Sequence, residues 1–210
     1  MYQPPHFRED RLEIQHGLIR SQPFAALVST GEGGLIANHI PMVLDADASE
    51  FGTLRCHLAR ANPQWRDFAA GGEALVIFQG PQAYVTPSWY ETKRETHKVV
   101  PTWNYAVVHA WGTPRVIEDA AWLADQIAAL THAHEAPRPE PWAVSDAPEA
   151  FVAAQIRGIM GVEIPIRRIE GKWKVSQNRP AADRTGVALG IQPEEPAMAA
   201  LVDAYGAGRR

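Results

Sequence analysis

The residues best suited to bind an anionic ligand follow one short apolar segment. In HLARANPQW (57–65), Arg60 and Asn62 come at the end of an expected strand, just before a helix that begins at Pro63. A guanidinium, an amide and the free N–H groups of a helix N-terminus are donors that suit a phosphate. A simpler explanation is that Asn62 only caps the helix and Arg60 is a solvated charge. Both interpretations stay open.

Two histidines alternate with apolar residues on strands that we expect to be neighbours. His39 lies in ANHIPMVL and His57 lies in TLRCHL. The two rings could meet across one face, but no Asp, Glu or Cys joins them at a recognisable metal-ligand spacing. A buried hydrogen-bonded pair, or contact with a flat ligand, is therefore favoured, and no metal site is predicted.

An aromatic segment, VPTWNYAVVHAWG (100–112), predicts a strand with two different faces. With a period of two, Trp103, Tyr105 and His109 share one face, and Asn104 lies on the other. Flat rings can stack on a planar ligand, and an amide such as Asn104 can pair with its polar edge. The same rings could instead pack a subunit interface, where Trp and Tyr are enriched.

A basic segment follows near the end of the chain. Between positions 157 and 184 there are seven Lys or Arg residues and three acids. Gln177, Asn178 and Arg179 come directly after an expected strand and could donate to a ligand's ring edge or phosphate. A solvated face or a contact with DNA phosphates would use the same charges. No recognisable helix-turn-helix accompanies them, so direct DNA reading has little support.

Other common catalytic arrangements are missing from the sequence. Neither Ser88 nor Ser176 lies in a GxSxG nucleophile elbow, and the single cysteine, Cys56, lies in an expected strand as a small apolar residue. The GxGxxG, GxxxxGK[ST] and HExxH motifs are also absent. Any chemistry would therefore belong to a cofactor that the protein positions.

The elements that must position these residues are mostly strands, with helices late in the chain. The segment 87–101 has little periodicity and is expected to be a loop. Expected strands cover 24–29 and 35–44 as a hairpin, 53–58, a bent 73–86, 103–117, and 162–175 with a hairpin turn at Glu170–Gly171; expected helices cover 63–70, 120–134 and 148–158, with one or two more after 181. This order favours an α+β fold around a small barrel.

Composition limits the class of protein. The chain has 210 residues, 46% of them hydrophobic, and a formal net charge of −4. These values exclude a disordered chain and a uniformly basic nucleic-acid binder. One cysteine fits a reducing compartment, and the sequence contains no apolar stretch long enough to span a membrane or serve as a signal peptide. We therefore expect a cytoplasmic protein with no membrane partner.

Five separated blocks carry a resemblance to a known family. These are MYQPPHF, HLARANPQW, FQGPQAYVTPSWY, VPTWNYAVVHAWG and KWKVSQNRPAADRTGV. Together they resemble the PaiB family, FMN-binding-type proteins often called negative transcriptional regulators. The resemblance implies an FMN-binding split β-barrel, similar to pyridoxamine-phosphate oxidase, with helices on the outside. It also implies a homodimer. We expect a single domain over 1–210, in which the helical patterns give a helical insert at about 119–158 and a helical tail at about 181–206.

With this resemblance, we expect FMN as the cofactor and a negative transcriptional regulator as the function. The alternative is a flavin-dependent oxidoreductase of the flavin reductase or pyridoxamine-phosphate oxidase type. A third possibility is another planar ligand such as haem, with His39, His57 or His109 as the axial residue. The expected cofactor-binding residues are His39, His57, Arg60, Asn62, Trp103, Asn104, Tyr105, Gln177, Asn178 and Arg179.

Overall fold

The computed structural model describes residues 1–69 and 71–206. The chain divides into two compact units. The first unit comprises Met1–Gln15, Gln79–Val108 and Glu170–Arg210, and the second comprises His16–Phe78 and His109–Ile169. Each unit is therefore assembled from segments that are far apart in the sequence.

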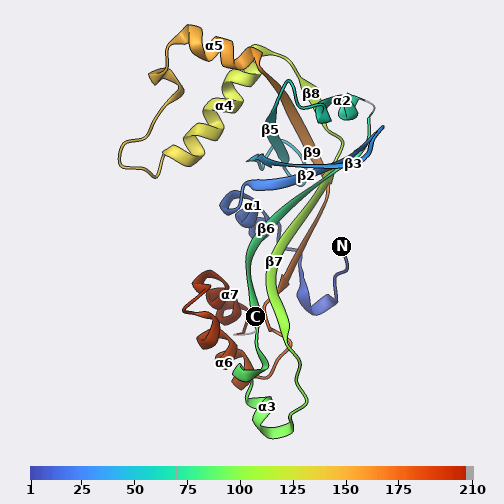
Figure 1. The fold of residues 1–210 in the computed structure, drawn as a ribbon, viewed down its shortest axis with the longest axis vertical. Helices are drawn as coiled ribbons and strands as arrows, with labels where there is room; N and C mark the ends of the chain where they lie inside the picture. The colour runs from blue at the N-terminus through green and yellow to red at the C-terminus, as the bar shows by residue number, and fades with distance from the viewer. Residues whose placement is uncertain (70, 207–210) are drawn as a thin grey trace. The chain divides into compact units, whose positions relative to one another are not determined.

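The strands form one antiparallel system (Figure 1). Hydrogen-bonded neighbours follow the order β3-β2-β6-β7-β9-β5-β4, while β1 and β8 also pair with β9. The strands are β1 (Arg8–Glu9), β2 (Phe24–Gly31), β3 (Gly34–Pro41), β4 (Val43–Asp45), β5 (Thr53–Ala59), β6 (Ala74–Val85), β7 (Thr102–Gly112), β8 (Arg115–Ile117) and β9 (Ile159–Lys174). The long strands β6, β7 and β9 contribute residues to both units.

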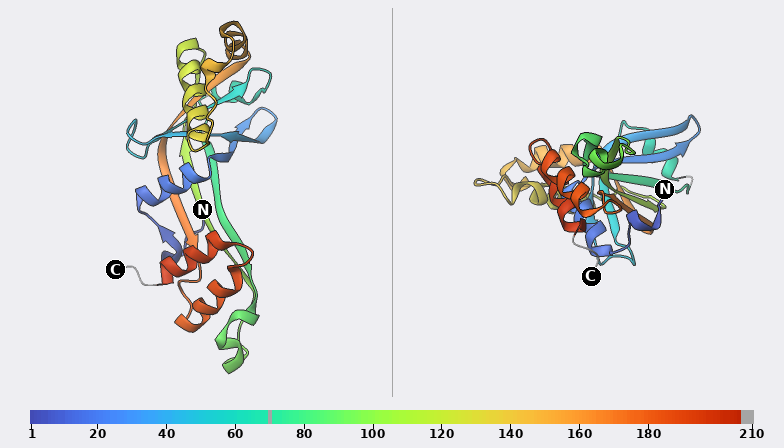
Figure 2. Two further views of the ribbon diagram at one scale, coloured as in Figure 1. Left: turned by 90° about the vertical axis from the view of Figure 1, so that its left-hand side faces the viewer. Right: turned by 90° about the horizontal axis from the view of Figure 1, so that it is seen from below.

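The helices lie in the connections and in the tail. They are α1 (Leu12–Ser21), α2 (Gln64–Ala69), α3 (Glu91–Thr96), α4 (Ala120–Glu135), α5 (Glu149–Arg157), α6 (Ala181–Ile191) and α7 (Pro196–Gly206), with the short turns η1 (Pro5–Phe7), η2 (Pro87–Trp89) and η3 (Val144–Asp146). Figures 1 and 2 show α6 and α7 side by side as a helical hairpin. None of the helices in the described residues is both long and apolar enough to cross a membrane.

Alternation of apolar and polar side chains builds the core of the second unit. Strands β2 and β3 form the expected hairpin, with Leu27 opposite Asn38 and Gly31 opposite Gly34. In β5, Leu54, Cys56 and Leu58 are buried, while the residues between them are only partly buried. Burial also raises the pKa of the Cys56 thiol to about 12, because a thiolate would lose its hydration. Cys56 is thus an inert core residue.

One sequence expectation is wrong. Of the segment 162–175, residues 162–174 belong to the single 16-residue strand β9, with no hairpin turn at Glu170–Gly171. The reason is that Gly171 pairs with Glu9 of β1, and a Cβ on Gly171 would collide with the Glu9 carbonyl. The glycine therefore permits a close strand approach rather than a turn.

Two other regions are more helical than the sequence indicates. The expected loop 87–101 contains η2 and α3, and α1 was not expected. In α1, Leu18 and Ile19 are buried together with the polar Gln15 and His16. Because half of this buried face is polar, the apolar period of a helix is hidden in the sequence.

A buried carboxylate joins the two ends of the first unit. Glu9 is 1% exposed and accepts hydrogen bonds from the Arg11 guanidinium at 2.8 and 2.6 Å and from the Tyr205 hydroxyl. Burial raises the pKa of Glu9, but the hydrogen bonds from Arg11 and Tyr205 and the charge of Arg11 outweigh it and hold this pKa at about 2. Helix α7 is thereby fixed to β1.

This carboxylate predicts a specific acid sensitivity. A pKa lowered from 4.5 to about 2 stabilises the fold above pH 4.5, and that stability is lost as the pH falls toward 2. The shift corresponds to about 3 kcal/mol. In urea unfolding across this pH range, Glu9→Gln should be less stable than wild type at pH 7 and should lose less stability on acidification.

The exposed neighbour Asp10 provides the control, because it forms an ion pair with Arg8 in which both side chains are more than half exposed. Asp10→Asn should keep the wild-type pH dependence. Equal pH dependence in Glu9→Gln and wild type would contradict the role given to Glu9.

Candidate functional site

The outer face of β5 carries the most unusual polar side chains of the second unit. Arg55 and His57 alternate with the buried residues of the strand, so they share the face away from the core. In the pairing with β9, Arg55 lies opposite Glu163 and His57 lies opposite Gly161. No ion pair among the described residues joins Arg55 to Glu163. We call Arg55, His57, Trp122 and Gln126 the β5 site.

Helix α4 supplies the other two residues of the β5 site. Asp119 caps this helix by accepting a hydrogen bond from the Trp122 backbone N–H at 2.8 Å. The Arg55 guanidinium lies 4.7 Å from the centre of the Trp122 ring. The indole also covers Gly161, because a Cβ at that position would collide with the ring. The cap, the ring and the glycine together fix how α4 lies on β5.

Three polar atoms of the β5 site are buried without a hydrogen-bond partner in the described part of the chain. They are Arg55 Nε, His57 Nδ1 and Gln126 Oε1. Gln126 is fully buried, and its Nε2 donates to the Arg55 carbonyl at 3.2 Å. Most buried polar atoms in folded proteins are satisfied, so a cluster of unsatisfied ones indicates a missing ligand or water.

Protonation of His57 is set by its surroundings. Burial lowers the pKa of this imidazole, because the charged form would lose its hydration. The ring is therefore neutral at pH 7, with one nitrogen that donates and one that accepts. The β5 site thus combines a permanent cation, a neutral imidazole and an amide oxygen beside an indole ring.

The residues at the end of β5 are already engaged within the protein. Asn62 Oδ1 accepts from the Gln64 N–H at 3.0 Å, so the capping explanation for Asn62 is realised. Arg60 donates to Glu118 at 3.0 Å and to the Arg157 carbonyl at 3.1 Å. The Arg60 side chain is nearly half exposed and could still donate to a further anion. Both residues remain predicted ligand contacts.

The expected pairing of the two histidines needs a correction. Strand β3, which carries His39, pairs with β2, whereas β5 pairs with β4 and β9. His39 and His57 are therefore not on hydrogen-bonded neighbours, and the His39 ring packs against Phe24 at 5.8 Å between centroids. No group of three or more His, Cys, Asp or Glu side chains within the described residues could hold a metal ion.

The aromatic segment has the two faces expected from its period. Trp103 is half exposed, Tyr105 is partly buried, and Asn104 is fully buried. The Asn104 amide exchanges hydrogen bonds with the Ser176 hydroxyl, at 2.9 and 3.2 Å, and Ser176 has a positive φ of 65°. The Tyr105 ring lies 5.4 Å from Lys172 Nζ. In this structure Asn104 holds a strained turn, and its contact with a ligand stays a prediction.

The basic segment after β9 closes a turn in the first unit. The Gln177 side chain accepts from the Val175 N–H at 2.8 Å and donates to the Trp173 carbonyl. The Arg179 guanidinium lies 4.7 Å from the centre of the Tyr90 ring. Asn178 is exposed. These three residues lie in the first unit, as do Trp103, Asn104 and Tyr105, whereas His39, His57, Arg60 and Asn62 lie in the second.

Sequence reasoning missed three members of the β5 site. Arg55 could have been found, because it lies two residues before His57 in an alternating strand and must share its face. Trp122 and Gln126 had no such signal, since only the packing of α4 on β5 brings them there.

Comparisons with known proteins point in one direction. The model of a family described as "Putative FMN-binding domain" matches residues 1–168. A Bacillus subtilis (strain 168) protein, protease synthase and sporulation protein PAI 2, is 32% identical over 93% of this chain and 91% of its own length. An uncharacterised protein of Emericella nidulans, AN0679, is 37% identical over 91% of this chain and 90% of its own.

Among solved structures, the flavocytochrome Anf3 from Azotobacter vinelandii has a similar fold. The superposition of the two structures has a TM-score of 0.57 and 12% sequence identity, and it covers 80% of this chain and 69% of the Anf3 chain. At this identity the likeness concerns the fold alone.

The close approach of Trp122 to Gly161 predicts the effect of one added methyl group. Gly161→Ala should lower the free energy of unfolding by about 1–3 kcal/mol, because the ring or the strand must move. Gly17→Ala is the matched control. Gly17 is exposed in α1, has open space at its Cβ, and should stabilise by about 0.5–1 kcal/mol on substitution. Urea midpoints that fall equally for both variants would contradict the packing described.

Proposed function

The chain belongs to the PaiB-type family of FMN-binding proteins with the split β-barrel fold, and from that premise we propose that its β5 site holds FMN. FMN is the cofactor that the family match supports. The observation that carries the proposed location is a pair of buried nitrogens, Arg55 Nε and His57 Nδ1, to which no described residue hydrogen-bonds. No other described segment offers two such atoms on one strand.

The donor set fits the chemistry of this group. FMN presents carbonyl oxygens, ring nitrogens and a dianionic phosphate, most of which accept hydrogen bonds. Arg55 can only donate, and a neutral His57 can donate through one nitrogen, so both complement acceptors. Trp122 adds a flat apolar surface beside them. The carboxylate of Glu163, opposite Arg55 in register, disfavours a phosphate directly beside it and favours the ring's carbonyl edge.

Each residue of the β5 site then has a definite task. Bound FMN would supply one- or two-electron redox chemistry, which the side chains of this chain lack. Arg55 would donate a charged hydrogen bond to an acceptor oxygen of FMN. The neutral imidazole of His57 would carry a proton on one of its nitrogens next to that oxygen. Trp122 would exclude water, because the cap at Asp119 keeps its ring over the strand. Arg60, at the exposed end of β5, is the residue that would meet a phosphate.

The regulatory role and the homodimer belong to the proposal as well. The resemblance to the PaiB family supports a flavin-responsive regulator. A homodimer is supported by β3, which ends the hydrogen-bonded strand order of the described residues, so its outer edge pairs with no strand among them. Leu35 on this strand is 80% exposed, and Phe24 on the adjacent β2 is also largely exposed. An exposed edge with apolar side chains suits pairing with a second copy.

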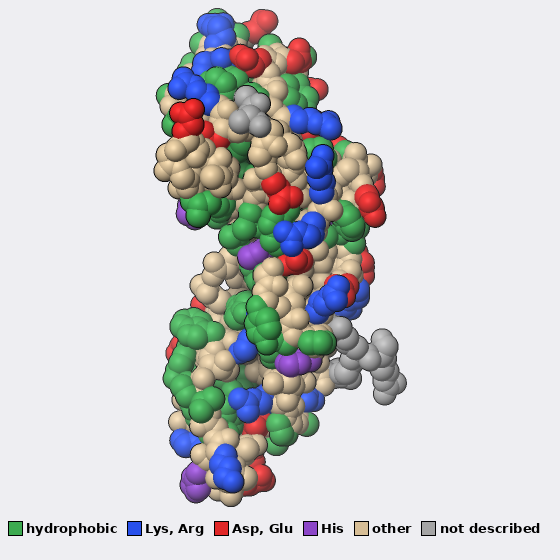
Figure 3. All heavy atoms as spheres, turned by 90° about the vertical axis from the view of Figure 1, so that its right-hand side faces the viewer, with side chains coloured by type: hydrophobic (Ala, Val, Ile, Leu, Met, Phe, Trp, Pro, Cys, Tyr) green, Lys and Arg blue, Asp and Glu red, His purple; other side chains and the backbone are tan. Residues whose placement is uncertain are grey.

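Helix α7 lacks, in its described residues, the side chains that direct recognition of DNA needs, so DNA binding is not part of the proposed function. Helices α6 and α7 are joined by a short turn, as in a helix-turn-helix, but the described residues of α7 include no Lys or Arg and one acid, Asp203. A recognition helix needs cations for the phosphates and polar side chains for the bases. On the face shown in Figure 3, basic and acidic side chains are interspersed rather than segregated. Regulation through a partner or through flavin state fits better.

A second candidate function is a flavin-dependent oxidoreductase. The observation that favours it is the fold shared with a protein described as a flavocytochrome. A neutral His57 beside a redox group could also hold a proton during turnover. The discriminating assay is oxidation of reduced nicotinamide by FMN-loaded protein with small electron acceptors. If the FMN-loaded protein oxidises reduced nicotinamide no faster than free FMN does, the oxidoreductase candidate fails and the regulatory function is the better proposal.

Arg55 provides the sharpest test of the proposed cofactor site. Arg55→Met removes a charged hydrogen bond worth about 1.5–3 kcal/mol, so FMN affinity should fall about 10- to 100-fold. Arg115→Met is the matched control, since Arg115 is an exposed arginine on β8, which pairs with β9 and not with β5. Titration of each variant with FMN, followed by quenching of flavin fluorescence, measures the difference.

Circular dichroism and urea unfolding establish that Arg55→Met is folded before the comparison. The proposal fails if purified wild-type protein shows no flavin absorbance and no thermal shift with added FMN. The proposed location fails if FMN binds to Arg55→Met and wild type with the same affinity.

The free edge of β3 predicts how the chain associates. Light scattering after size exclusion should give about twice the 23.1 kDa chain mass. Leu35→Asp should shift this mass toward the monomer, because a charge cannot be buried in an apolar contact. A wild-type monomer at every concentration tested, up to about 100 µM, would contradict the homodimer.

A further inference from the structure

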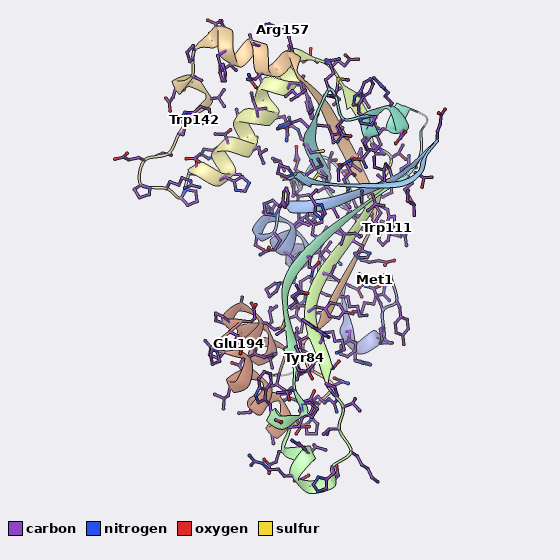
Figure 4. All side chains as sticks on the ribbon, in the orientation of Figure 1. Met1, Tyr84, Trp111, Trp142, Arg157 and Glu194 are labelled. Carbon is purple, nitrogen blue, oxygen red and sulfur yellow. The ribbon has the colours of Figure 1, made fainter. Side chains whose placement is uncertain are left out.

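A groove in the first unit lies between β6 and the turn that joins α6 to α7. Its volume is about 500 Å³, enough for a small organic molecule. Residues that line it include Tyr84, Thr86, Trp89, Trp103, Glu194 and Glu195. Figure 4 shows Tyr84 on β6 and Glu194 at the turn after α6. We call it the aromatic groove, and it uses none of the four residues of the β5 site.

Three aromatic side chains give the groove its apolar surface. Tyr84 and Trp103 meet edge to face, with ring centroids 5.9 Å apart and an interplanar angle of 70°. Both rings are about half exposed, at 49% and 54%. Trp89 lies flat against α6, because a Cβ at Gly190 would overlap its indole. The rings are thus held in place while their surfaces remain open to a ligand.

The charge in the groove is negative. Glu194 and Glu195 lie in the turn between the helices, where both backbone N–H groups donate to the Ile191 carbonyl, at 3.0 and 2.9 Å. Both residues are exposed, and neither takes part in an ion pair among the described residues. Among the described residues, no Lys, Arg or His lines the groove. The nearby Lys174 is occupied, because its ammonium donates to Thr102 Oγ1 and to the Trp103 carbonyl.

From this combination, we propose that the aromatic groove binds a small organic cation, an alkylated or quaternary ammonium. Faces of Trp and Tyr attract a cation and also contact its methyl groups, while the two carboxylates supply the opposite charge. An anion such as a flavin phosphate would be repelled by the same carboxylates. A neutral apolar ligand would leave the acids without a role. Trp103, expected from the sequence to touch a flavin, takes a different ligand in this proposal.

Choline is a suitable probe, because an uncharged analogue exists in which carbon replaces its quaternary nitrogen. Calorimetric titration of the full chain with each compound separates charge from shape. We expect saturable choline binding that is at least about fivefold tighter than binding of the analogue, as a cation–π contribution of about 1 kcal/mol predicts. Choline affinity should also fall as ionic strength rises.

Two variants locate the binding. Trp103→Leu should weaken choline about fivefold, and the double variant Glu194→Gln, Glu195→Gln should weaken it about tenfold. The charge-matched control is Glu13→Gln with Glu73→Gln, which removes two exposed acids elsewhere and should leave the affinity unchanged. All variants are first compared with wild type in thermal unfolding.

The proposal is overturned if choline does not bind saturably, if the analogue binds equally well, or if the two double variants behave alike. None of these outcomes depends on FMN, because the titrations use protein whether or not flavin is bound. A failure here is therefore distinguishable from a failure of the FMN site, which the Arg55 titration tests separately.

Discussion

Two buried nitrogens that have no hydrogen-bond partner among the described residues, Arg55 Nε and His57 Nδ1, are the constraint on which the functional interpretation depends. A buried donor left unsatisfied costs about 1–3 kcal/mol, and folded proteins rarely tolerate several of them together. Both side chains lie on one face of β5, and the Arg55 guanidinium packs against the Trp122 ring of α4. A ligand rich in acceptors would satisfy them. The family match supplies such a ligand in FMN.

The same alternation that builds the core also builds this site. Every second residue of β5, beginning with Leu54, is buried, and Arg55 between them contacts Trp122 and Gln126 of α4. Helix α4 is positioned by its cap at Asp119 and by Gly161, whose lack of a Cβ leaves room for the Trp122 ring. In the first unit, the buried carboxylate of Glu9 performs a comparable task by joining β1 to α7. Polar groups thus fix elements that apolar packing alone would leave free to shift.

Much of the fold could be predicted from the sequence, because local patterns encode it. The β2–β3 hairpin, β5, β7, α4 and α5 follow directly from the period of their apolar residues. The hairpin at Glu170–Gly171 could not be excluded, since a glycine that permits a close strand approach looks the same as one that permits a turn. Helix α1 was missed because its buried face includes Gln15 and His16.

The site was harder to predict than the fold. His57 and Arg60 were proposed as ligand contacts from their residue types and stay predictions, and Arg55 follows from the alternation that places it on the face of His57. Trp122 and Gln126 come from a distant helix, and only tertiary packing brings them to β5. The engagement of Asn62 as a cap and of Asn104 with Ser176 is likewise invisible in a residue pattern.

A crystal structure of the protein grown with FMN tests the central claim most directly. The account predicts an acceptor atom of the flavin within about 3 Å of Arg55 Nε, with the ring system beside Trp122. FMN bound elsewhere, with Arg55 Nε and His57 Nδ1 still lacking any partner, would contradict it.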